Sequence, residues 1–547
     1  MCMCMHMRMC MCMYVHACTV GKSFITARSG NWGGSEHCRL QMWQRTASAV
    51  AQELHQRRGT KAAGVCPVQS SVLRAVVSPR VVKQAGQVLR SGSGGSEATF
   101  NLSQPVDEID IFLSHSWRDS GLLKYLALCL HFNGAIAMVA ALISGFVTFF
   151  LLRSGKLTLF PFTPFMNVFN DVNEAMHAAG FHPSYDLKQF PWMDPTYKPI
   201  YAPSCQLVAT SVFVIVLLLG HHLRAPVTMF LDKVCIHQTD PQRKAAGIQA
   251  IDQFLVRSKK MLICYNDDYF ERLWCCFELA ARASSGSKIE MLPLWRAPVV
   301  LVVLVGFTVS HIVEYLYLLF AGVGGSPNGF LILSITFHLI PTLFMIEYTV
   351  LATRQKLKLT DTLRSFKIAN TKCFDPSDRS VVEQAISSWF ADGGEPEGAS
   401  GWQGPAGVDL RAIERFECDV RGGMTHRMIM SSVGKQPGLL RVHDLLLIFY
   451  TIWIPTGLDF SVKGVGRGNE MVLTFVIFVT PIAQGLAFIA VASVASALFR
   501  IRTDWPKWLL YVLLCFIFFA VMLIILHAIF IFIFGICQTA CIVPVPW

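Results

Sequence analysis

The residues Met261-Leu-Ile-Cys-Tyr-Asn266 and Tyr269-Phe-Glu-Arg-Leu-Trp-Cys-Cys-Phe-Glu-Leu279 form the most informative stretch of this 547-residue chain. The first segment is an apolar run of strand length that ends in an asparagine, which marks a turn. The second segment contains neither Gly nor Pro and predicts a helix over 268–283. Because an apolar run without alternation is typical of a strand buried on both faces, the pair indicates a parallel α/β sheet.

Further short apolar runs extend this pattern in both directions. With 260–265 they give four expected strands, the others being Ile109–Ser114, Val227–Leu231 and Ile289–Leu294. Apolar residues at helical spacing follow the first run in 121–132 and the second in 248–255. This alternation predicts a parallel sheet with helical crossovers. The loops 115–120, 232–247 and 266–274 then meet at the carboxyl ends of the strands, where ligands bind in such sheets.

These segments resemble the TIR (Toll/interleukin-1 receptor homology) domain. Asp110-Ile-Phe-Leu-Ser-His-Ser-Trp-Arg-Asp119 is similar to the first strand and loop of that family. Phe230-Leu-Asp-Lys233 is similar to its second strand, with 234–247 in the place of the BB loop. The stretch 261–279 is similar to its third strand and its W-C-x-x-E-L helix. The resemblance implies a flavodoxin-like parallel sheet.

The chain departs from the family in two places. Residues 133–225, with two expected membrane spans, separate the first helix from the second strand, where the family has only a short loop. A last strand and helix are also missing after Leu294. We expect Ser365–Phe374 to supply that strand and Asp375–Phe390 to supply the helix, because the second segment has apolar residues at helical spacing.

The composition indicates a membrane protein. Hydrophobic residues make up 53% of the chain and charged residues 15%, whereas soluble domains carry about 25% charge. Long windows lack Asp, Glu, Lys and Arg altogether: 125–152, 199–223, 315–346, 471–499 and 508–547. A spanning helix needs about 20 apolar residues. The expected spans are Ala135–Leu152, Cys205–Leu223, Ala297–Ala321, Gly329–Ala352, Leu445–Leu458, Met471–Phe499 and Lys507–Cys537.

The distribution of basic residues predicts the orientation of these spans. The stretch 224–296 carries eleven Lys and Arg and 353–441 carries thirteen, whereas the loop 153–204 carries four. Basic stretches stay in the cytoplasm. We therefore expect a multi-pass membrane protein with the N-terminus and the TIR-like domain in the cytoplasm and the C-terminus outside. The net charge of +11 is a topology signal, and we see no nucleic-acid motif.

The expected domain organisation alternates between these two kinds of sequence. A disordered or low-complexity region (1–105) precedes a first TIR-like segment (106–132), a transmembrane hairpin with an external loop (133–225), a second TIR-like segment (226–295), a second hairpin (296–352), a cytoplasmic segment (353–442) and C-terminal transmembrane helices (443–547).

The resemblance also implies a candidate active site. Some TIR domains cleave NAD at the nicotinamide–ribose bond with the glutamate of the W-C-x-x-E motif, which corresponds to Glu278 here. A fixed carboxylate can stabilise the oxocarbenium character of the ribose in that reaction. Trp274 is expected to form a wall of the pocket, and Ser114, Trp117 and Asp119 to line its opposite side. Asp268 is available as the N-cap of the helix.

A packing role for the same residues is the alternative. Trp274 and Leu279 can hold the helix on the sheet, and Glu278 can then be a solvated carboxylate. Ser116-Trp117 also departs from the Arg-Gly that plant-type TIR domains have at this point. The group Cys235, His237, Cys275 and Cys276 fits no zinc template, so we expect no metal and no certain cofactor.

We therefore expect signal transduction through TIR-type association, with itself or with other TIR-type domains, and NAD is a possible substrate. The expected partners of the protein include the lipid bilayer but no nucleic acid. One alternative is a transporter or channel with a regulatory TIR-like domain, favoured by Glu314, Glu347, Pro455 and Pro481 in or beside the spans. The other is a non-catalytic scaffold.

Overall fold

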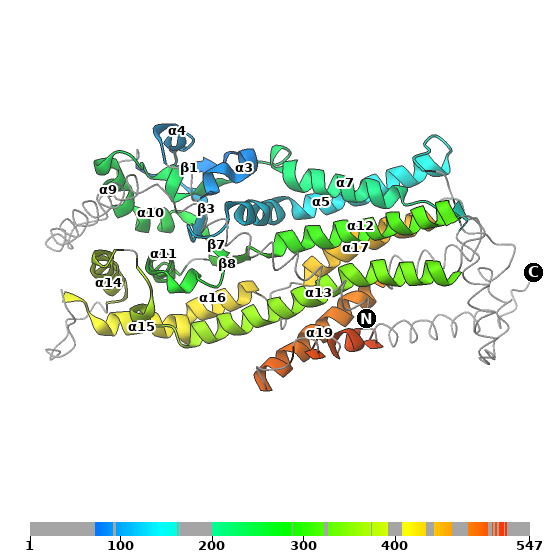
Figure 1. Cartoon of the computed structure of the whole chain (residues 1–547). Helices are drawn as coiled ribbons and strands as arrows, with labels where there is room; N and C mark the ends of the chain where they lie inside the picture. Colours follow the sequence, from blue (N-terminus) through cyan, green and yellow to red (C-terminus); the bar gives the residue numbers. More distant parts are fainter. Residues whose placement is uncertain are drawn as a thin grey trace, which may run out of the picture.

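The computed structural model is elongated, with the sheet and its short helices at one end and long helices extending from it (Figure 1). The structure describes residues 72–90, 95–160, 163–164, 200–286, 288–321, 327–373, 375–391, 407–433, 442–461, 480–501, 506, 509–510, 513–518 and 520–521.

A mixed sheet of six strands, in the order β2-β1-β6-β3-β7-β8, organises the described residues at this end. Four of them are β3 (Ile109–His115), β6 (Thr228–Phe230), β7 (Ser258–Tyr265) and β8 (Lys288–Pro293). β3 pairs in parallel with both β6 and β7, and β7 pairs in parallel with β8. The prediction that these four segments are neighbouring parallel strands is confirmed.

The other two strands come from sequence that we expected to lie before the ordered region. β1 (Arg74–Val77) pairs antiparallel with β6, and β2 (Gln104–Pro105) pairs antiparallel with β1. Helix α3 (Ser78–Gly86) and the short helix α4 (Glu97–Phe100) connect them. The expectation of a disordered region up to residue 105 is therefore wrong for 72–90 and 95–105, because a four-residue strand is too short to show a period.

Helices pack on both faces of the sheet. Helices α10 (Ile251–Val256) and α11 (Leu273–Ser284) lie on the side away from the long helices, whereas α3 and α5 lie on the other (Figure 1). The aromatic rings of Phe112 and Phe230 stack with their centroids 4.5 Å apart, and Phe254 of α10 lies against Phe230 at 4.4 Å. Burial on both faces explains why these strands are continuous apolar runs.

The first helix of the sheet domain is continuous with the first apolar helix. Helix α5 runs unbroken over Gly121–Arg153, so it joins the expected helix 121–132 to the expected span Ala135–Leu152 through Asn133 and Gly134. Asn133 is buried and its side-chain amide donates to the carbonyl of Leu217, 2.9 Å away. That partner on a neighbouring helix satisfies the amide N–H inside the packing, whereas Asn133 Oδ1 has no hydrogen-bond partner among the described residues.

Two local expectations are corrected. The region 234–247 is not a loop throughout, because α8 (Asp232–Cys235) and α9 (Pro241–Gln249) occupy most of it. Asp240 caps α9 by accepting from the backbone N–H groups of Gln242 and Arg243. Helix α11 begins at Leu273 after a short 3-10 turn, so Asp268 does not cap it.

The segment 365–390, for which we expected a last strand and a last helix of the sheet domain, matches that prediction only in its helix. The structure has no strand over the described residues of 365–374: a 3-10 turn covers Ile368–Asn370, and Lys372 forms a single parallel bridge with Arg272. The expected helix is present as α14 (Ser377–Phe390) and packs on α11. The ring of Trp389 lies 5.1 Å from that of Phe277. The segment therefore extends the helical layer instead of the sheet.

Within the described residues, three helices are long and apolar enough to cross a membrane: Gly121–Arg153, Ser204–His222 and Arg296–Tyr317. They correspond to α5, α7 (Ser204–Leu219) with the turn that follows it, and α12 (Arg296–Ala321). Helices α13 (Pro327–Arg364), α17 (Val442–Ser461) and α19 (Thr480–Ile501) cover the next expected spans wholly or partly. Most of the seventh expected span lies outside the described residues.

Candidate functional site

The candidate site lies at the carboxyl ends of the parallel strands, where Ser114 of β3 meets Glu278 of α11. The Ser114 hydroxyl donates to Glu278 Oε2 over 2.5 Å and lies 2.7 Å from the hydroxyl of Tyr269. Ser114 and Tyr269 are fully buried. The structure therefore brings together Ser114 and Glu278, which the sequence placed at this site, and adds Tyr269.

The environment of Glu278 changes its acidity. Burial raises the pKa of Glu278 to about 8, and the nearby negative charge of Asp232 acts in the same direction. The hydrogen bond from Ser114 and the positive charge of Arg272 oppose this rise in pKa. A carboxyl group with a pKa near neutrality can both give and accept a proton, which suits general acid–base catalysis.

Trp117 and Asp232 form a second pair at the carboxyl ends of the parallel strands, an edge of the sheet that we call the rim. The indole N–H of Trp117 donates to Asp232 Oδ2 at 2.9 Å. The ammonium groups of Lys233 and Lys124 lie 5.1 and 5.7 Å from the centroid of the Trp117 ring, within the range of cation–π attraction. Burial raises the pKa of Asp232 to about 6. The rim therefore carries several charged, partly desolvated side chains, which extend from the loop after β3 to the start of α8.

Three buried polar atoms at this rim have no hydrogen-bond partner among the described residues: His115 Nε2, Asp119 Oδ2 and Lys124 Nζ. Asp119 is held at its other oxygen by Asn266, whose amide donates over 3.0 Å. Burial lowers the pKa of His115 and of Lys124 and raises the pKa of Asp119. Since buried polar groups are nearly always satisfied, this cluster indicates a place for water or a polar ligand.

Trp274 does not lie where the sequence placed it. Its indole N–H donates to Asp378 of α14 at 2.9 Å, and its ring meets Phe277 edge to face at 5.3 Å. These contacts join α11 to α14, so they support the packing role that we considered as the alternative. The prediction that Trp274 is a pocket wall did not take into account that a later helix would cover this face of α11.

Sequence reasoning missed Lys124, Asp232, Tyr269 and Arg272 as members of the site. Arg272 donates from Nη1 to the Ser116 hydroxyl at 2.9 Å and so fixes the loop after β3. One signal could have found Lys124: it is the last charged residue before the uncharged window 125–152. A lysine in an otherwise apolar helix that packs on a sheet is buried only where a local polar group favours it.

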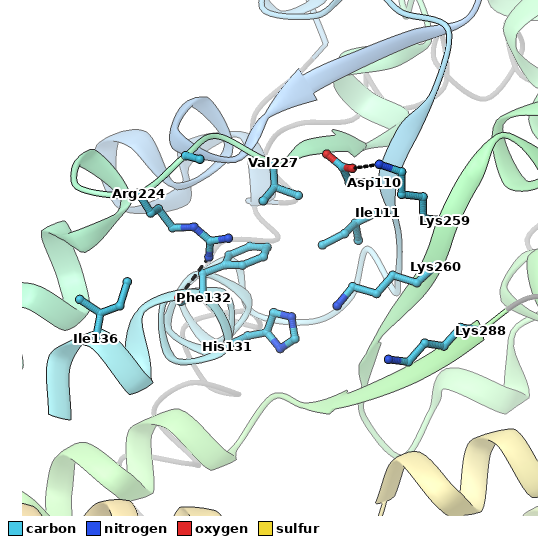
Figure 2. A pocket seen from close by; sticks show the side chains of 11 residues that line it. Asp110, Ile111, His131, Phe132, Ile136, Arg224, Val227, Lys259, Lys260 and Lys288 are labelled. Carbon is cyan, nitrogen blue, oxygen red and sulfur yellow. Dashed lines mark hydrogen bonds and ion pairs between the residues drawn. The ribbon is translucent and has the colours of Figure 1, made fainter. Parts of the chain in front are cut away.

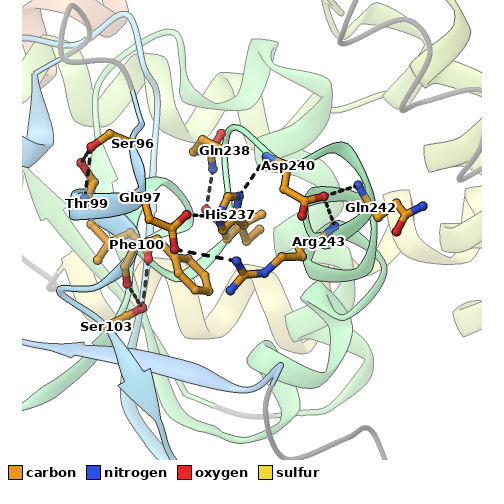
Figure 3. Close-up of polar contacts among 12 residues, drawn as sticks. Ser96, Glu97, Thr99, Phe100, Ser103, His237, Gln238, Asp240, Gln242 and Arg243 are labelled. Carbon is orange, nitrogen blue, oxygen red and sulfur yellow. Dashed lines mark hydrogen bonds and ion pairs between the residues drawn. The ribbon is translucent and has the colours of Figure 1, made fainter.

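The region 232–247 is fixed at the rim by the N-terminal segment (Figure 3). His237 Nε2 lies 2.6 Å from Glu97 Oε2 of α4, and His237 Nδ1 accepts from the backbone N–H of Asp240. Arg243 lies 3.8 Å from Glu97 and over the ring of Phe100. Among the described residues, no group of three His, Cys, Asp or Glu side chains is placed to hold a metal ion.

Comparison of the chain with family models, with curated proteins and with solved structures found no match.

Proposed function

We propose that this chain is a multi-pass membrane protein whose cytoplasmic TIR-like domain acts in signal transduction by associating with domains of the same kind. The strand order supports the TIR-like assignment. In order along the chain, β3, β6, β7 and β8 are the first to fourth parallel strands, and their spatial order is therefore 2-1-3-4. This is the beginning of the flavodoxin-like order that the sequence resemblance implies.

The observation that carries the signalling proposal is the continuity between the sheet domain and the apolar helices. Helix α5 packs on the sheet at its start and continues as one helix of 33 residues, about 50 Å long. Strand β8 ends at Pro293, and α12 begins at Arg296. With so few residues between them, a shift of either apolar helix moves a strand or a covering helix of the sheet.

Association can be tested on the exposed face of α9. Gln242 and Ala246 are exposed and one turn apart. We expect Gln242→Arg/Ala246→Arg to lower energy transfer between two differently labelled populations of the full chain in detergent micelles, because like charges then face each other. The matched control is Ser380→Arg/Ser388→Arg on α14, where both positions are exposed. Equal energy transfer in the two variants would contradict association through α9.

The cytoplasmic placement can be tested with Cys418, an exposed free cysteine of α15 (Leu410–Gly422). In sealed cells, a membrane-impermeant maleimide should leave the Cys418 peptide unmodified, as read by mass spectrometry. After selective permeabilisation of the plasma membrane or of the vesicle that holds the protein, the same peptide should react. Modification before permeabilisation would overturn the orientation.

Cleavage of NAD is the sharper form of the proposal and rests on Glu278. In that reaction the bond between nicotinamide nitrogen and ribose breaks, its electron pair leaves with neutral nicotinamide, and water adds to the ribose and loses a proton. Glu278, once ionised, would face the developing positive charge of the ribose. The cationic nicotinamide ring itself favours ionisation of a carboxyl group whose pKa is about 8.

The test is release of nicotinamide from NAD by the purified full chain. We expect Glu278→Gln to abolish release and Glu383→Gln to preserve it, since Glu383 pairs with Arg379 on α14. If the wild type releases no nicotinamide, or if Glu278→Gln releases as much, the catalytic form fails and the association proposal stands on its own test.

A polar cluster inside the apolar helices favours a transporter or channel as the second candidate. Asp459 of α17 is fully buried and accepts from the backbone N–H groups of Cys205 and Gln206 at 2.7 and 3.0 Å. The Gln206 side chain reaches Thr308 of α12 at 3.2 Å. One turn further along α12, His311 and Glu314 form a buried pair at 3.5 Å. Ionisable groups inside spanning helices are frequent on ion pathways.

Flux of protons or of monovalent cations into proteoliposomes tests this candidate. We expect Glu314→Gln to reduce such a flux and Ser493→Ala, an exposed position of α19, to leave it unchanged. A wild type that moves neither ion would remove this candidate.

A further inference from the structure

A large basic cavity lies at the other end of the sheet, where the parallel strands begin. Its volume is about 820 Å³. The first residues of β3, β7 and β8 form one side, and α5 around Phe132 and Ile136 forms the other, together with the chain just before β6 (Figure 2). Neither the proposed signalling nor the NAD chemistry uses this cavity.

Positive charge dominates the lining. Arg224, Lys259, Lys260 and Lys288 line the cavity together with a single carboxylate, Asp110. Lys259 pairs with Asp110 at 2.9 Å, and Lys260 pairs with Glu290 at 2.9 Å.

The other two basic residues of the lining, Lys288 and Arg224, have less negative charge beside them. Lys288 is exposed, and the structure records no ion pair for it with any described residue. Arg224 donates to the backbone carbonyl of Phe132, which carries no net charge. The cavity therefore keeps a surplus of positive charge and can attract an anion.

The position of Arg224 places the cavity at the end of the apolar helices. Arg224 is the first charged residue after the uncharged window 199–223. Its guanidinium lies over the ring of Phe132, 4.8 Å from the centroid, as Figure 2 shows. One turn further along α5, Ile136 is 43% exposed. The cavity is thus basic on the side of the sheet and apolar on the side of the long helices.

We propose that this cavity binds the phosphate-bearing headgroup of an anionic membrane lipid. The inference rests on the membrane placement proposed above. Cations at the cytoplasmic end of spanning helices attract anionic headgroups. The apolar surface at Ile136 then faces the acyl chains, which a free phosphate would leave exposed to water. Bound lipid would hold the beginnings of β3, β7 and β8 in a fixed position relative to α5.

The test is binding of short-chain phosphatidylinositol bisphosphate to the purified full chain in neutral detergent, followed by native mass spectrometry. Dioctanoyl phosphatidylcholine is the neutral lipid control, and inositol trisphosphate is the soluble headgroup control. We expect Lys260→Gln/Lys288→Gln to weaken binding of the anionic lipid about tenfold or more, since each basic residue near a headgroup contributes to the attraction. The matched control, Lys358→Gln/Lys372→Gln, removes two exposed lysines that pair with Asp267 and Glu271 at the opposite rim.

The outcomes separate the lipid site from the membrane placement. Retention of binding in Lys260→Gln/Lys288→Gln, or equal loss in both double variants, would overturn the site. Equal affinity for inositol trisphosphate and for the lipid would assign the cavity to a soluble phosphate and overturn the lipid proposal. Independently, the wild type should float with vesicles of phosphatidylcholine alone after alkaline extraction. Failure of that flotation, with lipid binding intact, would overturn the membrane placement and leave the cavity as a phosphate site.

Discussion

The two ends of the parallel strands contain polar side chains in opposite physical states. At the carboxyl ends, Ser114, Lys124 and Glu278 are held in a desolvated cluster in which burial shifts acidities. At the amino ends, Lys259 and Lys288 are exposed around an open cavity. Charged groups that keep their water attract a ligand from a distance, whereas desolvated groups carry chemistry or bind specifically. In the two proposals above, the sheet would therefore separate binding of an anionic headgroup at one edge from chemistry at the other.

The strongest challenge to this contrast is Arg282, a desolvated cation at the amino ends. Its guanidinium is fully buried and donates to the carbonyls of Leu255, Ser258 and Lys288 at 2.7, 2.8 and 3.3 Å. Arg282→Met removes three hydrogen bonds to these carbonyls from the interior, and we expect a loss of about 3–5 kcal/mol in the free energy of unfolding. Thermal unfolding in detergent checks it, with the exposed Arg257→Met as control. Similar midpoints for both variants would contradict a structural role.

A second prediction concerns the buried ammonium group of Lys124. Since Lys124 Nζ is buried without a hydrogen-bond partner among the residues that the structure describes, Lys124→Met should raise the free energy of unfolding by about 1–3 kcal/mol. The same variant should lose the function proposed for this edge of the sheet, measured as nicotinamide release. Lys358→Met serves as the control. A destabilised Lys124→Met would mean that the ammonium group has a structural partner and that the rim is a packing feature.

The third prediction uses pH to distinguish the rim from the rest of the sheet. The pKa of Glu278 is about 8 in the folded chain and about 4.3 in an unfolded one. Between these values the folded state binds more protons, so this group lowers stability as pH rises from about 5 to 8. Because the side chain is only partly buried, we expect a change of about 1–2 kcal/mol.

Comparison of thermal midpoints of the wild type and Glu278→Gln over that pH interval isolates this contribution. His115 is buried with a lowered pKa and has the opposite pH dependence, but it is common to both proteins. Parallel curves for the two proteins would show that Glu278 is solvated and ionised throughout.

The smallest effect is expected at the amino ends. The pair between Lys259 and Asp110 is exposed, with 64% and 36% of the two side chains accessible. Lys259→Gln should change the free energy of unfolding by less than about 0.5 kcal/mol, because solvent screens such pairs. Denaturant unfolding of the full chain measures it. A loss above about 1 kcal/mol would mean that these lysines stabilise the fold, and the contrast between the two ends would weaken.

The sequence predicted the four parallel strands within a few residues, because buried strands contain short apolar runs, such as 261–264, that alternate along the chain with segments of helical spacing. It also placed Ser114 and Glu278 at the same edge, since the carboxyl ends of parallel strands meet there. It expected them on opposite sides of a pocket, whereas a hydrogen bond joins them directly. It missed β1, which has only four residues and gains its order from pairing with β6. Such pairing joins segments that are far apart in sequence and has no local signal.

The errors at the site have a common cause. The contact of Trp274 with Asp378 joins residues 104 positions apart, and the polar group around Lys124 comes from several separate segments. Periodicity indicates which face of a helix is apolar, but it does not indicate which later element covers that face. Asp240-Pro241 did contain a local signal for the start of α9, and the polar composition of 234–247 concealed it.

Neither border of the described sheet presents a long unpaired strand, because the outermost strand on one side, β2, has only two residues. On one side the short strands β1 and β2 cover β6, and on the other the Ser432 hydroxyl of α16 (Met424–Val433) accepts from the backbone N–H of Met291 in β8. Unpaired strand edges are the usual template for intermolecular strand addition. Copies of this protein should therefore assemble through helix surfaces and inter-element turns, and a backbone-mimicking strand peptide should fail to compete with assembly.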